Sequence, residues 1–141
     1  MIFLDKALKL LLLSSPRITG IVGTAIYPNR IAEDVQAPCL YFKATKKPFI
    51  QTKNGVARAT TWTYIFGYKG RTSEEVQRLR AAVCDHLLSK RRTVKVSDTE
   101  RCLIENVIHA DYVNFDYSEE LNSWDEQDVL LVQWQEHIEN A

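Results

Sequence analysis

The sequence predicts an α+β fold, in which an antiparallel sheet of about four strands carries two main helices on one face. The predicted element order is α-β-β-α-β-β. Apolar residues recur at helical spacing in two stretches and alternate with a period of two in others. No repeat or linker divides the 141 residues, and this length suits one domain with its own hydrophobic core. We therefore expect residues 1–141 to form a single domain.

The first helix is predicted over residues 2–13, where leucines and an alanine fall on one helical face: Leu4, Ala7, Leu8 and Leu11. Pro16 is expected to end it, because a proline disfavours the helical conformation in the residue before it. The apolar run at residues 10–13 is far shorter than the roughly 20 residues of a membrane span. No basic n-region or cleavage site accompanies it. We expect a soluble protein made in the cytoplasm.

Gly20 and Gly23 raise the question of a phosphate-binding loop. They form only G-x-x-G, whereas a dinucleotide fingerprint needs G-x-G-x-x-G between a strand and a helix, and a P-loop ends in G-K-[ST]. Pro28 and Pro38 oppose a helix after the glycines. The sequence therefore predicts that the glycines serve turns, and that residues 20–38 connect the first helix to the next strand.

Two strands are predicted on either side of a polar segment. Residues 39–45 form a short run of mainly apolar residues after a proline. The clearest alternation runs through residues 60–68, where aromatic residues occupy every second position: Trp62, Tyr64, Phe66 and Tyr68. Such an alternation in a small domain normally faces the core. Residues 46–58 contain a proline and an Asn-Gly pair, which predict a protruding loop or β-arm.

The second helix begins with a capping-box pattern, Thr72-Ser-Glu-Glu75, in which Thr72 is the N-cap and Glu75 reaches back to it. One helical face then collects apolar residues up to about Ser89: Val76, Leu79, Val83 and Leu87. Basic residues at 90–92 suit the negative end of the helix dipole.

Two closing strands are predicted over residues 103–117 and 128–138. In the first, the apolar positions change phase near Tyr112, which indicates a β-bulge or a change of packing partner. Between the two strands, an acidic connection is expected at residues 116–128, where six carboxylates occur without Lys or Arg: Asp116, Glu119, Glu120, Asp125, Glu126 and Asp128.

No catalytic, cofactor or metal site is predicted. Cys84 and His86 are two residues apart on a helix and so face different directions, whereas helical ligands prefer a spacing of three or four. A Cys-His catalytic pair has no local support, and Glu119-Glu120 lack the apolar setting that would raise a pKa. The three cysteines are odd in number and widely spaced, which fits thiols in a reducing compartment. We expect a protein that is not an enzyme.

A small nucleic-acid-binding domain is the alternative of a different class. Basic residues at 46–47 and 90–92, with the aromatic strand, would carry it. The formal net charge of zero gives no general attraction to nucleic acid, and the glycine-aromatic signature of RNA-recognition domains is missing.

The charges are unevenly distributed along the chain. Basic residues gather in residues 43–58 and at the end of the second helix, while acidic residues dominate residues 116–128. A neutral protein with a basic pole and an acidic pole can associate head to tail, and such contacts close into rings. Two unrelated solvated patches would give the same pattern.

The order and character of these stretches resemble the tail-completion (tail-terminator) proteins of long-tailed bacteriophages and prophages. A leucine-rich first helix leads to ITGIVGTAIYP at residues 18–28 and to PCLYF at residues 38–42. An aromatic, threonine-rich strand, the TSEEVQRLRAAV helix at residues 72–83 and two closing strands follow, so that the likeness spans almost the whole chain.

The resemblance implies a structural virion protein that forms a ring, expected to be a hexamer. The ring would cap the tail tube, end its polymerisation and join the tail to the head. Its partners would be further copies of itself, the tail-tube protein and the head-completion or connector protein, with DNA only passing through the lumen. It would lie at the head-proximal end of the tail, after assembly in the host cytoplasm. Another neck or minor tail protein of similar fold is the alternative within this class.

The resemblance also gives expectations for the interface. The basic segment at residues 46–58 is expected to contact a neighbouring subunit or the tube, because a β-arm readily extends another subunit's sheet. Its candidate interface residues are Lys46, Lys47, Phe49, Lys53 and Arg58. The acidic connection would face the lumen or a partner, through Glu119, Glu120, Asp125 and Glu126.

Overall fold

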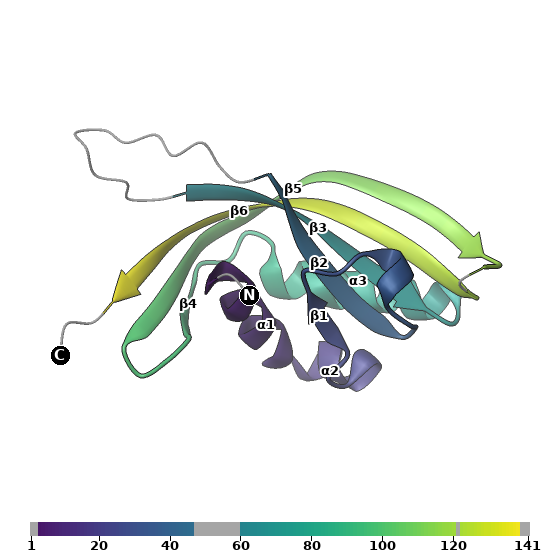
Figure 1. Cartoon of the computed structure of the whole chain (residues 1–141), viewed down its shortest axis with the longest axis horizontal. Helices are drawn as coiled ribbons and strands as arrows, with labels where there is room; N and C mark the ends of the chain where they lie inside the picture. Colours follow the sequence, from purple (N-terminus) through teal and green to yellow (C-terminus); the bar gives the residue numbers. More distant parts are fainter. Residues whose placement is uncertain (1–2, 47–59, 121, 139–141) are drawn as a thin grey trace.

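A curved sheet with helices on one side forms the body of the protein (Figure 1). The computed structural model describes residues 3–46, 60–120 and 122–138. These residues form a six-stranded sheet in the order β1-β2-β3-β6-β5-β4. The strands are β1 (Ile26–Pro28), β2 (Cys39–Lys46), β3 (Thr60–Gly70), β4 (Arg92–Lys95), β5 (Glu100–Ser118) and β6 (Ser123–Ile138). The helices are α1 (Phe3–Leu13), α2 (Pro16–Val22) and α3 (Ser73–Leu87), with the 3-10 turn η1 (Ala32–Asp34).

The α+β class and the helical face of the sheet follow the prediction, but the four-strand antiparallel sheet is wrong. Two short strands were missed, and one of them, β1, pairs with β2 in parallel. β1 has three residues and β4 has four, so neither is long enough to show an alternation. In β4 only Val94 is buried, among charged or polar neighbours.

The third helix was missed because Pro16 begins α2 instead of only ending α1. Ser15 is the N-cap, and its side chain accepts a hydrogen bond from the backbone N–H of Ile18. Proline suits the first helical position, because a backbone N–H at this position has no partner within the helix and its absence in proline costs nothing. Gly20 therefore lies inside α2, and Gly23 ends the helix with a φ of 60°. The turn role predicted for the glycines holds for Gly23 alone.

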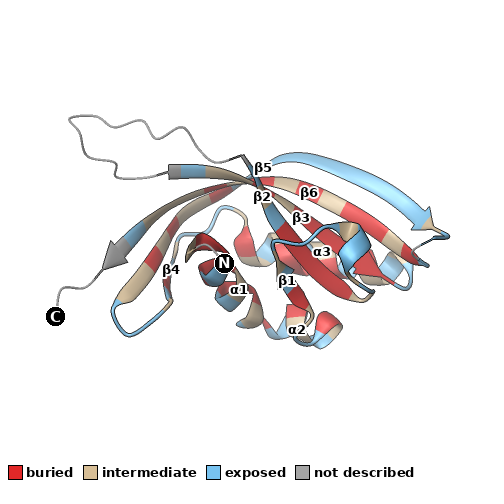
Figure 2. Ribbon diagram, in the orientation of Figure 1, coloured by how far each residue is buried: buried red, intermediate tan, exposed pale blue. Residues whose placement is uncertain are grey.

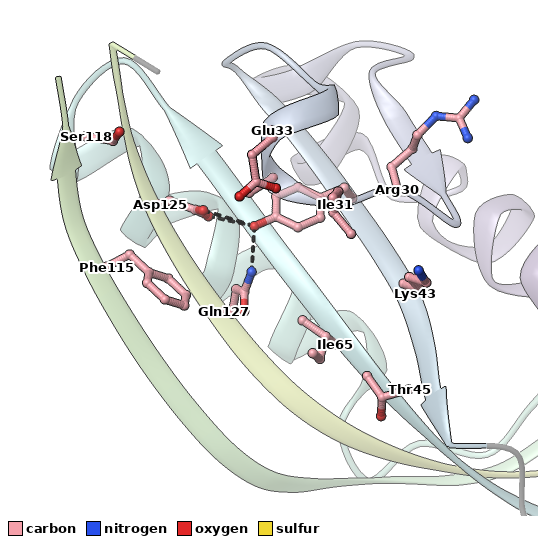
Figure 3. Close-up of a pocket in the computed structure, with 12 residues that line it drawn as sticks. Arg30, Ile31, Glu33, Lys43, Thr45, Ile65, Phe115, Ser118, Asp125 and Gln127 are labelled. Atoms are coloured by element: carbon pink, nitrogen blue, oxygen red, sulfur yellow. Dashed lines mark hydrogen bonds between the residues drawn. The ribbon is translucent and has the colours of Figure 1, made fainter. Parts of the chain in front are cut away.

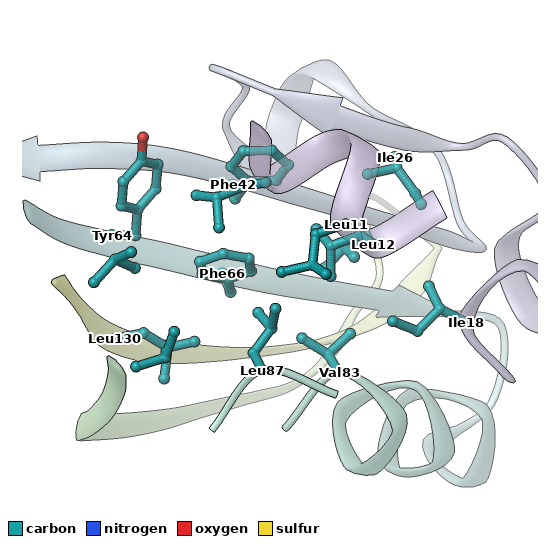
Figure 4. Close-up of a cluster of buried hydrophobic side chains, with 14 of the residues drawn as sticks. Leu11, Leu12, Ile18, Ile26, Phe42, Tyr64, Phe66, Val83, Leu87 and Leu130 are labelled. Carbon is teal, nitrogen blue, oxygen red and sulfur yellow. The ribbon is translucent and has the colours of Figure 1, made fainter. Parts of the chain in front are cut away.

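The core lies between the helices and the facing side of the sheet (Figure 4). Side chains of α1 (Leu11 and Leu12) and of α3 (Val83 and Leu87) meet Phe66 of β3. The prediction that the aromatic strand faces the core is confirmed, because Tyr64, Phe66 and Tyr68 are fully buried and Trp62 is half-buried. Tyr64, Phe66 and Tyr68 therefore offer no exposed surface on which nucleic-acid bases could stack.

Helix α3 follows its prediction closely. Its four predicted apolar positions are all buried, and the Thr72 hydroxyl accepts a hydrogen bond of 3.1 Å from the backbone N–H of Glu75. The second half of the capping box differs slightly, because the Glu75 carboxylate accepts from the backbone N–H of Arg71, at 3.0 Å. None of the described helices is long and apolar enough to cross a membrane.

The hairpin of β5 and β6 is longer than predicted. The phase change in β5 is confirmed as irregular pairing, with register shifts at Ile104/Asn106, His109/Asp111 and Asn114/Tyr117. β5 continues to Ser118 and β6 begins at Ser123. The expected acidic connection at residues 116–128 is therefore wrong in its extent, because both of its ends belong to strands.

Candidate assembly surface

One half of β5 lies at an open edge of the sheet. β4 pairs only with residues 101–104, and the Val107 carbonyl accepts a hydrogen bond from the backbone N–H of Ser89. Beyond that point, residues 108–117 pair with β6 on one side, and no strand of the described chain pairs with them on the other. We call residues 108–117 the β5 edge.

The β5 edge is exposed along its whole length (Figure 2). Five of its large hydrophobic side chains are 38–53% exposed: Ile108, Tyr112, Val113, Phe115 and Tyr117. An exposed apolar group of this kind on an unpaired strand typically marks a protein interface or an aggregation site. Two side chains within the edge bind backbone N–H groups of the same strand. The Asp111 carboxylate accepts a hydrogen bond from the backbone N–H of Tyr112, and the Asn114 side-chain oxygen accepts one from that of Asp116, both at 2.8 Å.

A buried carboxylate on β6 anchors the β5 edge from inside. Asp128 is fully buried and accepts two hydrogen bonds of 2.9 Å from the guanidinium of Arg80 on α3. It also accepts a hydrogen bond of 2.8 Å from the Tyr68 hydroxyl. One of its oxygens lies 2.7 Å from His109 Nε2 on β5. Burial alone would raise the pKa of Asp128, but hydrogen bonds from Arg80, His109 and Tyr68 hold it below its ordinary value.

The same cluster holds Tyr112 of the β5 edge. The Arg80 guanidinium lies 4.1 Å from the centroid of the Tyr112 ring, a cation–π arrangement. The Tyr112 hydroxyl donates to the carboxylate of Glu126, which is itself buried. Two β5 residues, His109 and Tyr112, are thus fixed to α3 and β6 while the strand between and beyond them stays exposed.

A second buried carboxylate lies on the face of the sheet opposite the helices. The Tyr41 hydroxyl donates to Asp125 at 2.9 Å and accepts from the Gln127 amide at 2.9 Å, as the dashed lines in Figure 3 mark. Tyr41 lies over Gly67, where an added Cβ would come within 1.9 Å of the tyrosine ring. Burial raises the pKa of Asp125 to about 6. Lys69, also buried, donates hydrogen bonds to the carbonyls of Ala32 and Val35. It thereby ties η1 and its two flanking residues (residues 31–35, here called the η1 segment) to this face.

A cavity of about 450 Å³ opens on this face beside the β5 edge. Phe115 lines it from β5, Ile65 from β3, and Ile31 and Glu33 from the η1 segment (Figure 3). The Tyr41–Asp125 pair forms part of its wall. The cavity is mainly apolar, and both basic residues (Arg30 and Lys43) and carboxylates (Glu33 and Asp125) line it, which suits a docked side chain of a partner.

The three cysteines are held as thiols by their surroundings. Burial raises the pKa of the Cys84 thiol to about 11 and those of Cys39 and Cys102 to about 12, so all three are protonated at neutral pH. His86 Nε2 donates a 2.8 Å hydrogen bond to the Leu11 carbonyl. Within the described part of the chain, no group of three or more His, Cys, Asp or Glu side chains could hold a metal ion.

The structure separates the residues that the sequence placed in one acidic connection. Glu119 and Glu120 follow β5 and are exposed. Asp125 and Glu126 belong to β6 and are only 6% exposed, so the prediction of an exposed acidic loop is wrong for these two residues. Their buried setting comes from tyrosines on β2 and β5 that are far away in the sequence, and no local pattern reveals it.

The basic interface candidates lie mostly outside the described residues. Lys46 is the last residue of β2. The other four, Lys47, Phe49, Lys53 and Arg58, fall in residues 47–59, which the structure does not describe. Sequence reasoning did not identify the Asp128 cluster or the Tyr41–Asp125 pair. One signal was available, because a tyrosine in a buried strand needs a partner for its hydroxyl.

The comparisons with known proteins find matches among solved structures. No protein-family model matches the sequence, and no curated protein matches it. The structure matches a chain from the virion of a native gene transfer agent (GTA) particle, with a TM-score of 0.64 over 93% of each chain. The chain shares its fold with a virion protein. The sequences are 13% identical, so the match concerns the fold.

Proposed function

We propose that this chain is a structural subunit of a phage or prophage virion, and within it the tail-completion protein. A ring of its copies caps the tail tube, ends tube polymerisation and joins the tail to the head. The observation that carries the proposal is the fold shared with the GTA virion chain over 93% of both chains. The resemblance of the sequence to tail-terminator proteins gives the finer role.

The character of the surface supports an assembly role. The β5 edge offers unpaired backbone and exposed aromatic side chains, and a largely apolar cavity opens next to it. Interfaces are enriched in aromatic residues, and an added strand gains main-chain hydrogen bonds. The role we propose is assembly and not catalysis.

The remaining interface residues keep the roles that the sequence suggested. The basic segment with Lys46, Lys47, Phe49, Lys53 and Arg58 contacts a neighbouring subunit or the tube. Glu119 and Glu120, exposed after β5, face the lumen or a partner. In the lumen, their charge would repel DNA and help it to slide.

Tube polymerisation tests the function directly. The purified protein is mixed with the tail-tube protein encoded beside it, and tube lengths and ends are observed by negative-stain electron microscopy. We expect ring-shaped caps at one tube end and tubes that stop growing. Tubes of unchanged length with bare ends would contradict the tail-completion role.

Another neck or minor tail protein of the same fold is the second candidate. The GTA match supports it equally, because the match is to a chain of the whole virion. A protein that ignores tube ends but binds the purified head connector in a pull-down would favour it. Steep salt-dependent binding to single-stranded DNA would instead favour the nucleic-acid-binding alternative.

A further inference from the structure

Two segments of the chain carry charges of opposite sign. Thr60 of β3 pairs with Trp134 of β6, and Gly70 pairs with Trp124, so the two ends of this strand pair lie ten residues apart, roughly 33 Å. Residues 46–58 join β2 to β3 at the Thr60 end and contain four basic residues and no acidic one. The β5 edge runs along the sheet from the level of Thr63, through Leu131, to that of Gly70, through Trp124, so the turn after it lies at the Gly70 end. Residues 108–120 contain four carboxylates and no Lys or Arg.

The charge of the β5 edge selects among its possible occupants. Two β5 edges paired with each other would bring carboxylates such as Asp111 and Asp116 of both copies together, and like charges across paired strands are destabilising. A basic strand would be attracted to the same edge. The four carboxylates of residues 108–120 are all exposed, namely Asp111, Asp116, Glu119 and Glu120.

The shape of the β5 edge limits how long that strand is. Register shifts at His109/Asp111 and Asn114/Tyr117 interrupt the pairing of β5 with β6. A bulged strand twists and cannot pair regularly over its whole length, which also restrains indiscriminate aggregation. The occupant is therefore a short segment, paired near Tyr112 and Val113, with side chains packed on the exposed hydrophobic residues.

We propose that the β5 edge receives residues 46–58 of a second copy of this chain, which add a short strand to it. The inference rests on the proposed ring function and identifies the β5 edge as the surface through which one subunit binds its neighbour. Each copy gives its basic segment from the Thr60 end of its sheet and receives the segment of another copy along its own β5 edge. Such a heterologous contact repeats from copy to copy, and it forms a ring where the rotation between copies closes.

Cysteine cross-linking between copies tests the pairing. Val113 is 40% exposed at the middle of the β5 edge, and Lys53 lies at the middle of the basic segment. The doubly substituted chain, Val113→Cys with Lys53→Cys, is oxidised across a concentration series, and products are separated without reductant. We expect a ladder of covalent oligomers. Leu10→Cys with Lys53→Cys is the matched control, because Leu10 is equally exposed, at 42%, on α1.

Each other outcome has a definite meaning. Covalent dimers from Val113→Cys alone would overturn the proposal in favour of symmetric pairing of two β5 edges. Rings seen by native mass spectrometry without the Val113–Lys53 cross-link would overturn the proposed receiving surface and leave the ring function standing. A chain that stays monomeric and forms no cross-link at any concentration would overturn both.

Charge reversal gives a second, independent readout. Glu119→Lys with Glu120→Lys, or Lys47→Glu with Lys53→Glu, should each weaken association several-fold, more strongly at low salt. The chain that carries all four substitutions should recover most of the loss. Equal weakening by both pairs with no recovery in the combined chain would contradict contact between these two charged groups.

Discussion

Strand β3 and the β5 edge are both rich in aromatic residues, yet one is buried and the other is exposed. Tyr64, Phe66 and Tyr68 of β3 are fully buried under α1 and α3, whereas Tyr112, Phe115 and Tyr117 of β5 are 38–53% exposed. The difference lies in their place in the sheet, because β3 is central and β5 extends beyond β4. Aromatic content therefore predicts a strand, and the neighbouring elements decide whether that strand serves the core or an interface.

The largest effect should come from truncating matched phenylalanines in the two strands. Phe66 is fully buried and stacks on Phe42 with a centroid distance of 5.2 Å, so Phe66→Ala should lower the free energy of unfolding by about 3–5 kcal/mol. Phe115→Ala, at 53% exposure, should change it by less than about 0.5 kcal/mol. Urea denaturation measures both. Similar losses for the two variants would show that the β5 edge also serves the core.

A buried and an exposed ion pair give the next contrast. Asp128→Ala leaves Arg80, His109 and Tyr68 without their shared acceptor and should cost about 3 kcal/mol or more. Asp85→Ala breaks the exposed 2.7 Å pair with Arg17 and should cost about 1 kcal/mol or less. Thermal unfolding of both variants checks this. A small loss for Asp128→Ala would mean that the cluster does not anchor β5.

The two buried aspartates should respond to pH in opposite ways. The folded-state pKa of Asp125 is raised from 3.8 to about 6, so its contribution to stability falls as the pH rises through this window, by up to about 3 kcal/mol. The pKa of Asp128 is lowered, so its contribution is present above its unfolded pKa and is lost as the pH falls below it. Asp125→Asn should remove the decrease in stability that accompanies the ionisation of Asp125. Identical pH profiles for wild type and Asp125→Asn would contradict the burial of this carboxylate.

Gly67 offers a smaller test of the same face. Alanine there would place a Cβ within 1.9 Å of the Tyr41 ring, which must move away from Asp125 and Gln127. We expect Gly67→Ala to cost about 1–3 kcal/mol. Adding Tyr41→Phe should not restore the loss, because the ring stays. Chemical denaturation of the single and double variants measures it, and a neutral Gly67→Ala would show that Tyr41 has room to shift.

Secondary-structure elements could be predicted from the sequence where their signal is local. The N-cap of α3, its apolar face and the aromatic alternation of β3 each lie within a dozen or so residues and were predicted. β1 and β4 were missed because three or four residues show no period, and α2 was missed because Pro16 both follows one helix and begins the next.

The candidate surface was harder to predict, because its parts come from distant elements. Glu119 and Glu120 could be assigned to an exposed turn, but Asp125, Glu126 and Asp128 looked the same in sequence and are buried. Their partners, among them Tyr41, Tyr112 and Arg80, lie on β2, β5 and α3. The exposure of the β5 edge depends on where β4 ends, and only the fold reveals that.

Native mass spectrometry of wild type and Phe115→Lys tests the central claim, that the β5 edge serves assembly, most directly. A lysine at this exposed position should leave the melting temperature almost unchanged while it places a cation among the hydrophobic side chains of the interface. The account predicts a closed ring, expected to be a hexamer, for the wild type and a monomer for Phe115→Lys. A wild type that is monomeric at every concentration, or a ring that Phe115→Lys leaves intact, would contradict it.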